Sequence, residues 1–378
     1  MPIRCFLKNL SLILICTFTL SGCGDSEDRA SSEKTDSVFE KKVYKWKMVT
    51  TWPKNLPGLG FAAENFSKLV GKMSGGRLLI KVFGAGQLVP ALEVFDAVSQ
   101  GTAQIGHGSA YYWKGKIQTA ALFTTVPFGL NAQEMNSWLH YGGGIELWRE
   151  LYEPFNLVPL AAGNTGVQMA GWFNREINSI EDLKGLKMRI PGIGGEVISK
   201  LGVETVNIPG GELFTAMQTG VIDATEWVGP YNDLALGFHQ VAKYYYYPGW
   251  QEPGPTLELI INKQLYDGLP QDLQAIIEVA ARAINQDMLD EYTARNQKAL
   301  DLLVNTHGVQ LKKLPDPVLS KLKNITQKVL KEMVAKDPVF KKVYESQEAF
   351  KEQIKKYHKI SEQSYYHARE IKNLNYKR

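Results

Sequence analysis

The sequence has 378 residues, of which 43 are Lys or Arg and 39 are Asp or Glu, for a formal net charge of +4. This balance offers no electrostatic basis for binding nucleic acid. The three cysteines are Cys5, Cys16 and Cys23. The chain beyond them therefore has no thiol for cysteine catalysis, a disulfide or a thiolate metal site.

The first 22 residues are typical of a bacterial signal peptide. Arg4 and Lys8 form a basic start, and the apolar run Leu10–Leu20 is too short to span a bilayer. The run ends in Leu-Ser-Gly-Cys, which resembles a lipobox and predicts lipidation of Cys23. The alternative is an ordinary signal peptide followed by a chance cysteine. Residues 23–43 are polar and charged, as a flexible tether should be, so we expect a lipid-anchored protein of the cell envelope.

Strands and helices alternate after the tether. Residues 44–52 and 77–83 predict strands, and a helix between them presents one apolar face made of Ala62, Phe66, Leu69, Val70 and Met73. Residues 90–100 predict a further helix, followed by a strand near residues 103–107. This alternation predicts an α/β architecture with sheets covered on both faces.

Two stretches share one plan. "EVFDAVSQGTAQIGHG" begins at Glu93 and "ELFTAMQTGVIDATEW" begins at Glu212. Each predicts a helix closed by a glycine and then a short strand, which suggests two lobes of similar plan; coincidence is the alternative. In this alignment Glu226 falls opposite His107, just past the carboxyl end of a strand, where open α/β sheets bind ligands. A cleft between two such lobes is a favoured ligand site.

We expect lobe I to comprise residues 44–166 and about 255–295, and lobe II residues 167–254 and about 296–315. Residues 316–378 predict C-terminal helices, the last beginning after Pro338. If helical to about Lys372, this last segment would reach ~50 Å at about 1.5 Å per residue. Such a helix must lie across both lobes or bury its apolar stripe on a second subunit.

Catalytic motifs are missing from the sequence. It contains neither the H-E-x-x-H zinc pair nor the G-x-S-x-G nucleophile elbow. Gly58, Gly60 and Ala63 fit a loose dinucleotide pattern, but they lie in a Pro-flanked loop and are interpreted as the entry to a helix. The glycine run at residues 192–195 lacks the Lys-Ser/Thr of a phosphate loop. We therefore expect a binding protein rather than an enzyme.

The sequence does contain a set of residues suited to binding a small ligand. Arg189 ends the apolar strand "LKMRI", and its planar fork can hold a carboxylate through two parallel hydrogen bonds. Glu226 lies in an apolar setting, and its simplest partner could be Arg189 itself in a structural ion pair. Gln168 offers an amide oxygen, unless it is an internally paired strand amide. The aromatic residues that could wall a small pocket, or belong to the core, are Trp227, Trp172, Phe173, Tyr112, Trp113 and Trp250.

These stretches together resemble the solute-binding proteins of tripartite ATP-independent periplasmic (TRAP) transporters. The resemblance runs from about Tyr44 to at least Asp301 and rests on "LKGLKMRIPG", "ELFTAMQTGVIDATEW" and "INKQLYDGLPQDLQAII". "YYYYPGWQEPG" and "GVQMAGWF" are similar to the branch that binds 2-oxo acids or lactate. The resemblance implies a two-lobed periplasmic-binding-protein fold with a hinge, a ligand cleft between the lobes and a long C-terminal helix.

The resemblance also implies roles for particular residues. The family arginine that binds the substrate carboxylate matches Arg189. Independently of the resemblance, we expect Tyr112, Phe173, Trp227 and Trp250, from the set of aromatic residues above, to surround the substrate together with Gln168. A cation, sodium or calcium, would be held by Gln168, Glu226 and the backbone carbonyl of Trp227. The partners would be two TRAP membrane subunits, and the long helix could be exchanged within a homodimer. The alternatives are a ligand-presenting sensor for another organic acid and an exported enzyme acting on a carboxylate.

A charge argument supports the cation. A 2-oxo or 2-hydroxy acid brings one negative charge into a cleft that already holds Glu226. Two buried negative charges against Arg189 alone leave an uncompensated anion, which costs several kcal/mol. Oxygen ligands suit Na⁺ or Ca²⁺ rather than zinc. Chelation by the carboxylate and the neighbouring oxygen would select 2-substituted acids.

Overall fold

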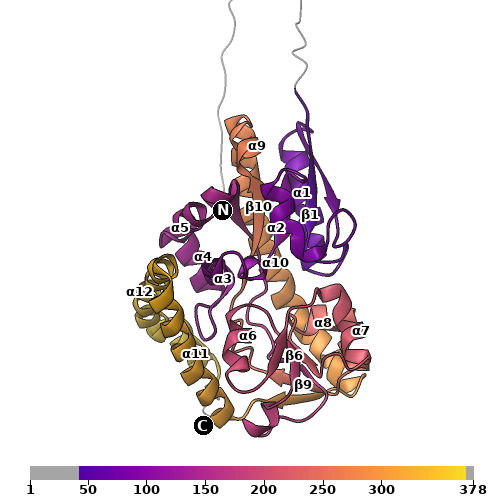
Figure 1. The fold of residues 1–378 in the computed structure, drawn as a ribbon, viewed down its shortest axis with the longest axis vertical. Helices are drawn as coiled ribbons and strands as arrows, with labels where there is room; N and C mark the ends of the chain where they lie inside the picture. Colours follow the sequence, from indigo (N-terminus) through magenta and orange to yellow (C-terminus); the bar gives the residue numbers. More distant parts are fainter. Residues whose placement is uncertain (1–41, 372–378) are drawn as a thin grey trace, which may run out of the picture. The chain divides into compact units, whose positions relative to one another are not determined.

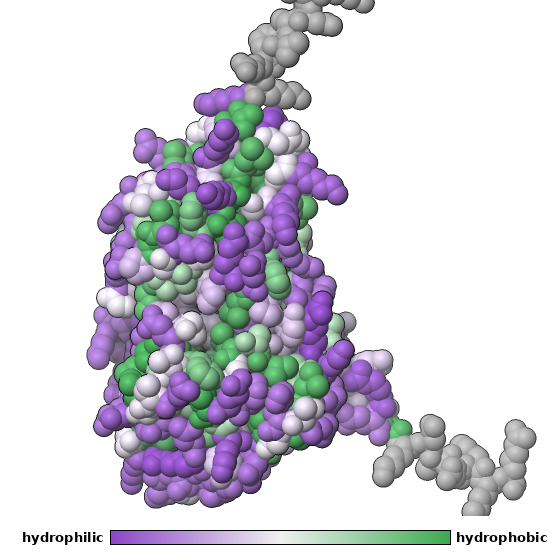
Figure 2. Space-filling view, turned by 90° about the vertical axis from the view of Figure 1, so that its right-hand side faces the viewer, coloured by the Kyte–Doolittle hydropathy of each residue, from purple (hydrophilic) through white to green (hydrophobic). Residues whose placement is uncertain are grey.

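The computed structural model describes residues 42–371. The predicted signal peptide, the lipidation of Cys23 and nearly all of the predicted tether lie outside the described residues. Among the residues described, no helix is both long and apolar enough to cross a membrane. Over the face shown in Figure 2, hydrophobic residues lie scattered among hydrophilic ones.

The first sheet, sheet A, has the strand order β2-β1-β3-β10-β4. Its strands are β1 (Tyr44–Thr50), β2 (Leu78–Phe83), β3 (Ile105–Gly108), β4 (Leu157–Asn164) and β10 (Thr256–Asn262). β1 pairs in parallel with β2 and β3, whereas β10 is antiparallel to both of its neighbours. Every residue of β4 and β10 is buried, as expected where helices cover both faces of a sheet.

The second sheet, sheet B, has the order β11-β9-β5-β8-β6-β7. Its strands are short: β5 (Gly171–Phe173), β6 (Lys187–Arg189), β7 (Glu204–Val206), β8 (Ala224–Thr225), β9 (Tyr244–Tyr247) and β11 (Gln310–Lys313). We call sheet A with its helices lobe I and sheet B with its helices lobe II (Figure 1). The two-lobed fold with mixed sheets confirms the predicted fold class.

The chain crosses between the sheets three times. It leaves sheet A after β4, returns from β9 to β10, and passes again to β11 at the end of α10 (Gln271–Asn305). At about 1.5 Å per residue, this helix of 35 residues is ~52 Å long. It contacts β4 and α1 (Leu59–Met73) in lobe I and α8 (Pro230–Leu236) in lobe II, so one rigid element supports both lobes.

The two similar stretches do form similar structures. In lobe I a 3₁₀ turn (Ala91–Glu93) leads into α2 (Val94–Ser99), and in lobe II a 3₁₀ turn (Gly210–Glu212) leads into α7 (Leu213–Gln218). A left-handed glycine follows each helix, at φ 82° in the first and 72° in the second, where a residue with a side chain would be strained. The strands that follow, β3 and β8, each pair in parallel with the first strand of the lobe's βαβ unit.

Five shorter helices pack against the sheets. They are α3 (Ala121–Thr124), α4 (Ala132–Tyr141), α5 (Gly144–Tyr152), α6 (Gly192–Ser199) and α9 (Lys263–Asp267), together with a 3₁₀ turn at Ala110–Trp113 that bears on the site.

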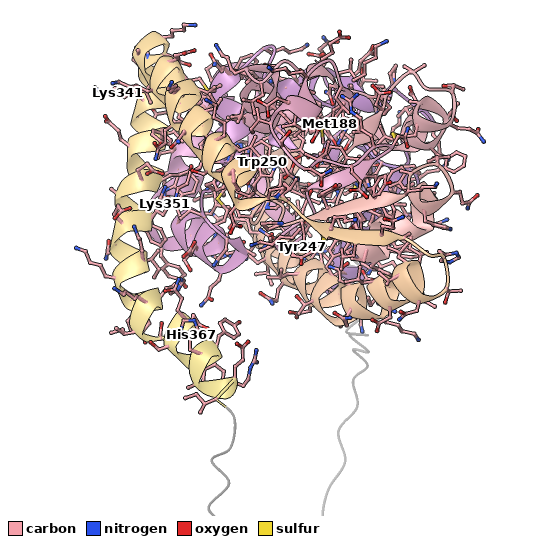
Figure 3. The ribbon with its side chains drawn as sticks, turned by 90° about the horizontal axis from the view of Figure 1, so that it is seen from below. Met188, Tyr247, Trp250, Lys341, Lys351 and His367 are labelled. Carbon is pink, nitrogen blue, oxygen red and sulfur yellow. The ribbon has the colours of Figure 1, made fainter. Side chains whose placement is uncertain are left out.

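The C-terminal helices run along both lobes. α11 (Asp316–Lys336) contacts α6 in lobe II, and α12 (Pro338–Ile360) contacts α3, α4 and α5 in lobe I (Figure 1). The long helix is therefore present, but it ends at Ile360, because Ser361 leaves the helical region at φ −102° and ψ −94°. α13 (Glu362–Arg369), which carries His367, then continues at the rim of the molecule (Figure 3).

Candidate functional site

Four of the predicted site residues, Arg189, Glu226, Gln168 and Trp250, lie at one edge of sheet B. Arg189 is the last residue of β6, and Glu226 directly follows β8, which runs parallel to β6. β5 is antiparallel to β8, so Gln168, which precedes β5, lies at the same edge. β9 is antiparallel to β5, which brings the segment after β9, with Trp250, to this edge as well. Segments distant in sequence therefore converge where α/β sheets bind ligands.

Backbone hydrogen bonds hold these segments side by side. The N–H of Gln168 donates to the carbonyl of Glu252 at 3.1 Å, and the N–H of Met169 donates to the carbonyl of Val228 at 3.0 Å. The Gln168 segment thus lies between the segments that follow β8 and β9. Gly249 makes this approach possible, since a Cβ there would come within 2.1 Å of the Gln168 carbonyl oxygen.

Arg189 and Glu226 form a fully buried ion pair, since neither side chain is exposed to solvent. Arg189 Nη1 donates to Glu226 Oε1 and, at 3.2 Å, to the Glu226 carbonyl. Nε donates to the Ile208 carbonyl at 3.1 Å, and Nη2 donates to the Tyr112 hydroxyl of lobe I at 3.2 Å. The ion pair between Glu226 and Arg189, which the sequence analysis gave as one alternative, therefore forms in the structure. The guanidinium carbon also lies 5.1 Å from the centre of the Trp227 ring, a cation–π distance.

Several buried oxygens at this edge lack donors. Among the described residues, no hydrogen bond reaches Gln168 Oε1, Glu226 Oε2, Gln251 Oε1 or Glu252 Oε2. All four are acceptors, and a buried acceptor without a partner costs about 1–3 kcal/mol. Arg189 uses four hydrogen bonds although a guanidinium has five N–H groups. Amide and carboxylate oxygens are the donor atoms that hard cations prefer, so these residues fit the predicted Na⁺ or Ca²⁺.

Burial disfavours the charged forms of both carboxylates. Desolvation raises the pKa of Glu226 to about 7, although Arg189 acts in the opposite direction. Desolvation also raises the pKa of Glu252 well above its usual range, and repulsion from Glu226 adds to this. Arg189 alone does not compensate the two acids, and a positive charge next to them would lower both pKa values.

The aromatic residues predicted around the substrate take different places. Tyr112 reaches Arg189 from lobe I, and Trp227 stacks near the guanidinium. Trp250 packs on Phe128 of lobe I with ring centres 5.8 Å apart. Phe173 lies in β5, where it packs edge-on against Tyr246 at 5.2 Å. These predicted roles in substrate binding remain predictions.

One amide and one acidic side chain at this edge were not predicted from the sequence. Gln251 and Glu252 follow β9 and are 1% and 2% exposed. Gln251 Nε2 donates to the Met169 carbonyl at 2.8 Å. The available signal was a Gln-Glu pair inside the aromatic, Pro- and Gly-flanked stretch "YYYYPGWQEPG".

Contacts between the lobes close over the site. Lys114 of lobe I donates to the Gly192 carbonyl of lobe II at 2.7 Å and lies 3.1 Å from Glu196. On the other side, Asn232 of lobe II donates to the Pro57 carbonyl of lobe I at 2.5 Å and accepts a hydrogen bond from the Trp227 indole. In this arrangement Arg189, Glu226 and Gln168 are buried, and Tyr112 is half-buried.

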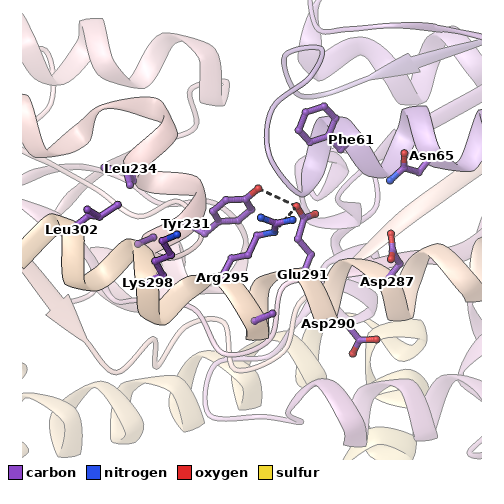
Figure 4. A pocket seen from close by; sticks show the side chains of 12 residues that line it. Phe61, Asn65, Tyr231, Leu234, Asp287, Asp290, Glu291, Arg295, Lys298 and Leu302 are labelled. Carbon is purple, nitrogen blue, oxygen red and sulfur yellow. Dashed lines mark hydrogen bonds and ion pairs between the residues drawn. The ribbon is translucent and has the colours of Figure 1, made fainter.

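A separate groove of about 940 Å³ lies between α1, α8 and α10 (Figure 4). Tyr231 and Arg295 both bind Glu291 on its wall, with Tyr231 donating at 3.0 Å. None of the predicted site residues lines this groove.

The two-lobed fold and the oxygen-rich site closed between the lobes define an extracytoplasmic solute-binding protein. The chain belongs to the bacterial extracellular solute-binding protein family 7, DctP, the TRAP transporter solute-binding proteins, which residues 48–337 match. The resemblance inferred from the sequence is thereby confirmed.

Close relatives have known ligands. The chain is 46% identical to the monocarboxylate 2-oxoacid-binding periplasmic protein of Nostoc sp., over 94% of this chain and 96% of that protein. A TRAP solute-binding protein of Colwellia psychrerythraea, solved with calcium and pyruvate, is 44% identical with a TM-score of 0.84, over 86% of this chain and 100% of that one. One from Pseudoalteromonas atlantica, solved with sodium and pyruvate, is also 44% identical with a TM-score of 0.84, over 88% and 100%.

Proposed function

We propose that this protein captures a small 2-oxo or 2-hydroxy monocarboxylate, such as pyruvate or lactate, together with Na⁺ or Ca²⁺, and delivers it to the membrane subunits of a TRAP transporter. The observation that carries the proposal is the buried Arg189–Glu226 pair beside acceptor oxygens without donors. The names of the relatives and their bound pyruvate support the same ligand class.

In this proposal Arg189 binds the substrate carboxylate, with Tyr112 bringing a second polar group from lobe I. Gln168, Glu226 and the Trp227 carbonyl hold the cation, whose positive charge offsets the buried carboxylates. Because Glu226 gives Oε1 to Arg189, its other oxygen remains for the cation. Ligand contacts with both lobes would stabilise the closed state over the open one.

Calorimetry tests the proposal directly. Ligand-stripped, refolded protein is titrated with pyruvate and with lactate in sodium, calcium and cation-depleted buffers. Propionate is the matched control, because it has the same chain length but no oxygen at carbon 2. We expect cation-dependent binding of pyruvate or lactate and weak binding of propionate. Binding that ignores the cation would refute the ion site, and equal binding of propionate would refute the chelation.

We further propose that the protein is a binding protein and not an enzyme acting on the carboxylate. Recovery of unchanged pyruvate after prolonged incubation, measured by mass spectrometry, is the expected result. Conversion of the ligand would instead support the exported-enzyme alternative.

We also infer a homodimer formed through the C-terminal helices. Phe340 and Val343 on α12 are buried within the chain, but Tyr357 and Ile360 are 63% and 73% exposed. A second copy would cover this exposed apolar end. Light scattering of the wild type and of Ile360→Glu tests it: a dimer that the variant weakens is expected, and a wild-type monomer would refute it.

The lipid anchor remains a proposal based on the lipobox-like sequence. Mass spectrometry of the mature N-terminus would reveal a diacylated Cys23 if the proposal is right, and an unmodified N-terminus if an ordinary signal peptidase acts.

A further inference from the structure

Trp113 lies between two residues that reach lobe II, Tyr112 and Lys114. The Tyr112 hydroxyl accepts a hydrogen bond from Arg189 at 3.2 Å. Lys114 donates to the Gly192 carbonyl at 2.7 Å. Trp113 itself is buried in lobe I and is only 2% exposed. The position of both contacts between the lobes therefore depends on how Trp113 is held.

Glu258 of β10 holds Trp113 by a hydrogen bond inside lobe I. The Trp113 indole N–H donates to Glu258 Oε1, and the Tyr152 hydroxyl donates to Glu258 Oε2 at 2.9 Å. Glu258 and Tyr152 are both fully buried. Glu258 lies opposite Gly108 of β3, where a Cβ would come within 3.1 Å of the Trp113 ring. The indole is therefore bonded to the acid on one strand and packs on the bare backbone of the next.

A carboxyl group suits this place because two buried donors meet there. A buried indole N–H or hydroxyl without an acceptor is destabilising, and Glu258 offers one oxygen to each donor. Burial raises the pKa of Glu258 to about 8, so the neutral acid predominates at pH 7. Glutamine has nearly the same shape as the neutral acid and also presents one acceptor and one donor side. Leucine would fill the space but leave both donors without a partner.

The other end of the turn has its own support. The 3₁₀ turn that contains Trp113 begins at Ala110, and the Tyr111 N–H donates to the Thr124 hydroxyl at 3.1 Å. Loss of the Glu258 contact should therefore displace the Trp113 end of the turn without unfolding the whole turn.

The acid also links the turn to a crossing between the lobes. β10 begins at Thr256, directly after the connection from β9 that carries Trp250. Glu258 thus lies in the strand by which the chain re-enters lobe I from the site. Through Trp113, this strand is joined to the turn that carries Tyr112.

We propose that Glu258 is a positioning residue for ligand binding: by holding Trp113, it fixes the turn that presents Tyr112 and Lys114 to lobe II. The inference rests on the proposed function, in which Tyr112 and Arg189 meet beside the bound carboxylate. Glu258 does not touch the ligand and acts only through Trp113. A purely structural role would lower the stability of the protein without changing the ligand affinity of the folded state.

The experiment compares wild type, Glu258→Leu, Glu258→Gln and a matched pair, Trp113→Phe and Tyr152→Phe. Each member of the pair removes one donor to Glu258 and keeps an aromatic ring, but only Trp113 belongs to the turn. Calorimetry measures pyruvate affinity in sodium and in calcium buffers. Urea unfolding without ligand measures stability and shows which variants are folded.

Glu258→Leu should weaken pyruvate binding by about 5- to 100-fold, because the unpaired indole shifts the turn. Trp113→Phe should weaken it by at least about five-fold, whereas Tyr152→Phe should lower stability but keep the Kd within about two-fold of wild type. Glu258→Gln should recover most of the affinity that Glu258→Leu loses. In a Tyr112→Phe background, Glu258→Leu should have a smaller effect than in wild type, because both changes act on one contact.

Wild-type affinity in a folded Glu258→Leu protein would overturn the inference. Equal losses of affinity in Trp113→Phe and Tyr152→Phe would do the same, and this comparison remains decisive if Glu258→Leu does not fold. No recovery in Glu258→Gln, or full additivity with Tyr112→Phe, would also contradict it. A wild type that binds no pyruvate with either cation would overturn the proposed function, and this inference with it.

Discussion

Removing Arg189 should damage ligand binding and folding for separable reasons. In Arg189→Met, the bound carboxylate loses its buried cationic partner, which costs about 2–5 kcal/mol of binding free energy. This corresponds to a rise in Kd of about 30- to 5,000-fold. The variant also leaves Glu226, which is fully buried, without the guanidinium that donates to it. Breaking a buried pair in this way should cost about 3–5 kcal/mol of unfolding free energy.

The double variant Arg189→Met/Glu226→Gln separates the two effects. It removes the orphaned charge as well, so most of the lost stability should return, because an ion pair replaced on both sides is close to neutral for folding. Ligand binding should not return, because the carboxylate still has no arginine. Urea unfolding without ligand measures the first quantity, and calorimetry with pyruvate measures the second.

Two results would refute this reasoning. Wild-type pyruvate affinity in a folded Arg189→Met protein would show that Arg189 does not bind the carboxylate. Equal stability of the wild type and the single variant would show that the buried pair with Glu226 does not form in solution.

Three further predictions concern closure and the core. Lys114→Met removes the partly exposed contact with the Gly192 carbonyl, which is worth at most about 1 kcal/mol. Stopped-flow measurements should therefore show ligand dissociation up to about five-fold faster. An unchanged dissociation rate would exclude this contact from the closed state. Asn232→Ala leaves the Pro57 carbonyl unpaired between the lobes, so pyruvate affinity should fall by about 1–3 kcal/mol, and undiminished affinity would contradict a role in closure. Burial raises the pKa of Glu258 to about 8 from 4.5. The folded state therefore binds the extra proton, and unfolding free energy should fall between pH 4.5 and 8, by at most about 5 kcal/mol, then level off. Glu258→Gln should reduce this slope in urea titrations at pH 5–9, and Glu226 should account for part of the slope that remains. A wild-type slope in the variant would assign the effect to another group.

The sequence alone sufficed for the family and the two-lobed α/β class. It also singled out Arg189, Glu226 and Gln168, whose roles in binding remain predictions. Apolar periodicity predicts helices and strands locally, and the matching stretches that begin at Glu93 and Glu212 do form the same helix, glycine and strand in both lobes. Arg189 and Glu226 could be chosen because charged residues inside apolar strands and motifs need a partner. Their being brought together follows from the parallel pairing of β6 with β8.

Only the tertiary structure decided what these residues contact. Glu252 lies in a connection with no periodic pattern, and its burial depends on the register of β9 and β5 and on Gln168, which lies far away in sequence. The choice of Arg189 as the partner of Glu226 and the packing of α12 on lobe I also depend on contacts between distant segments. Hydrophobic periodicity and residue propensity depend on residues close together in the sequence, so they predict local helices and strands. Burial and charge pairing depend on segments that come into contact only after folding, so they cannot be predicted in this way.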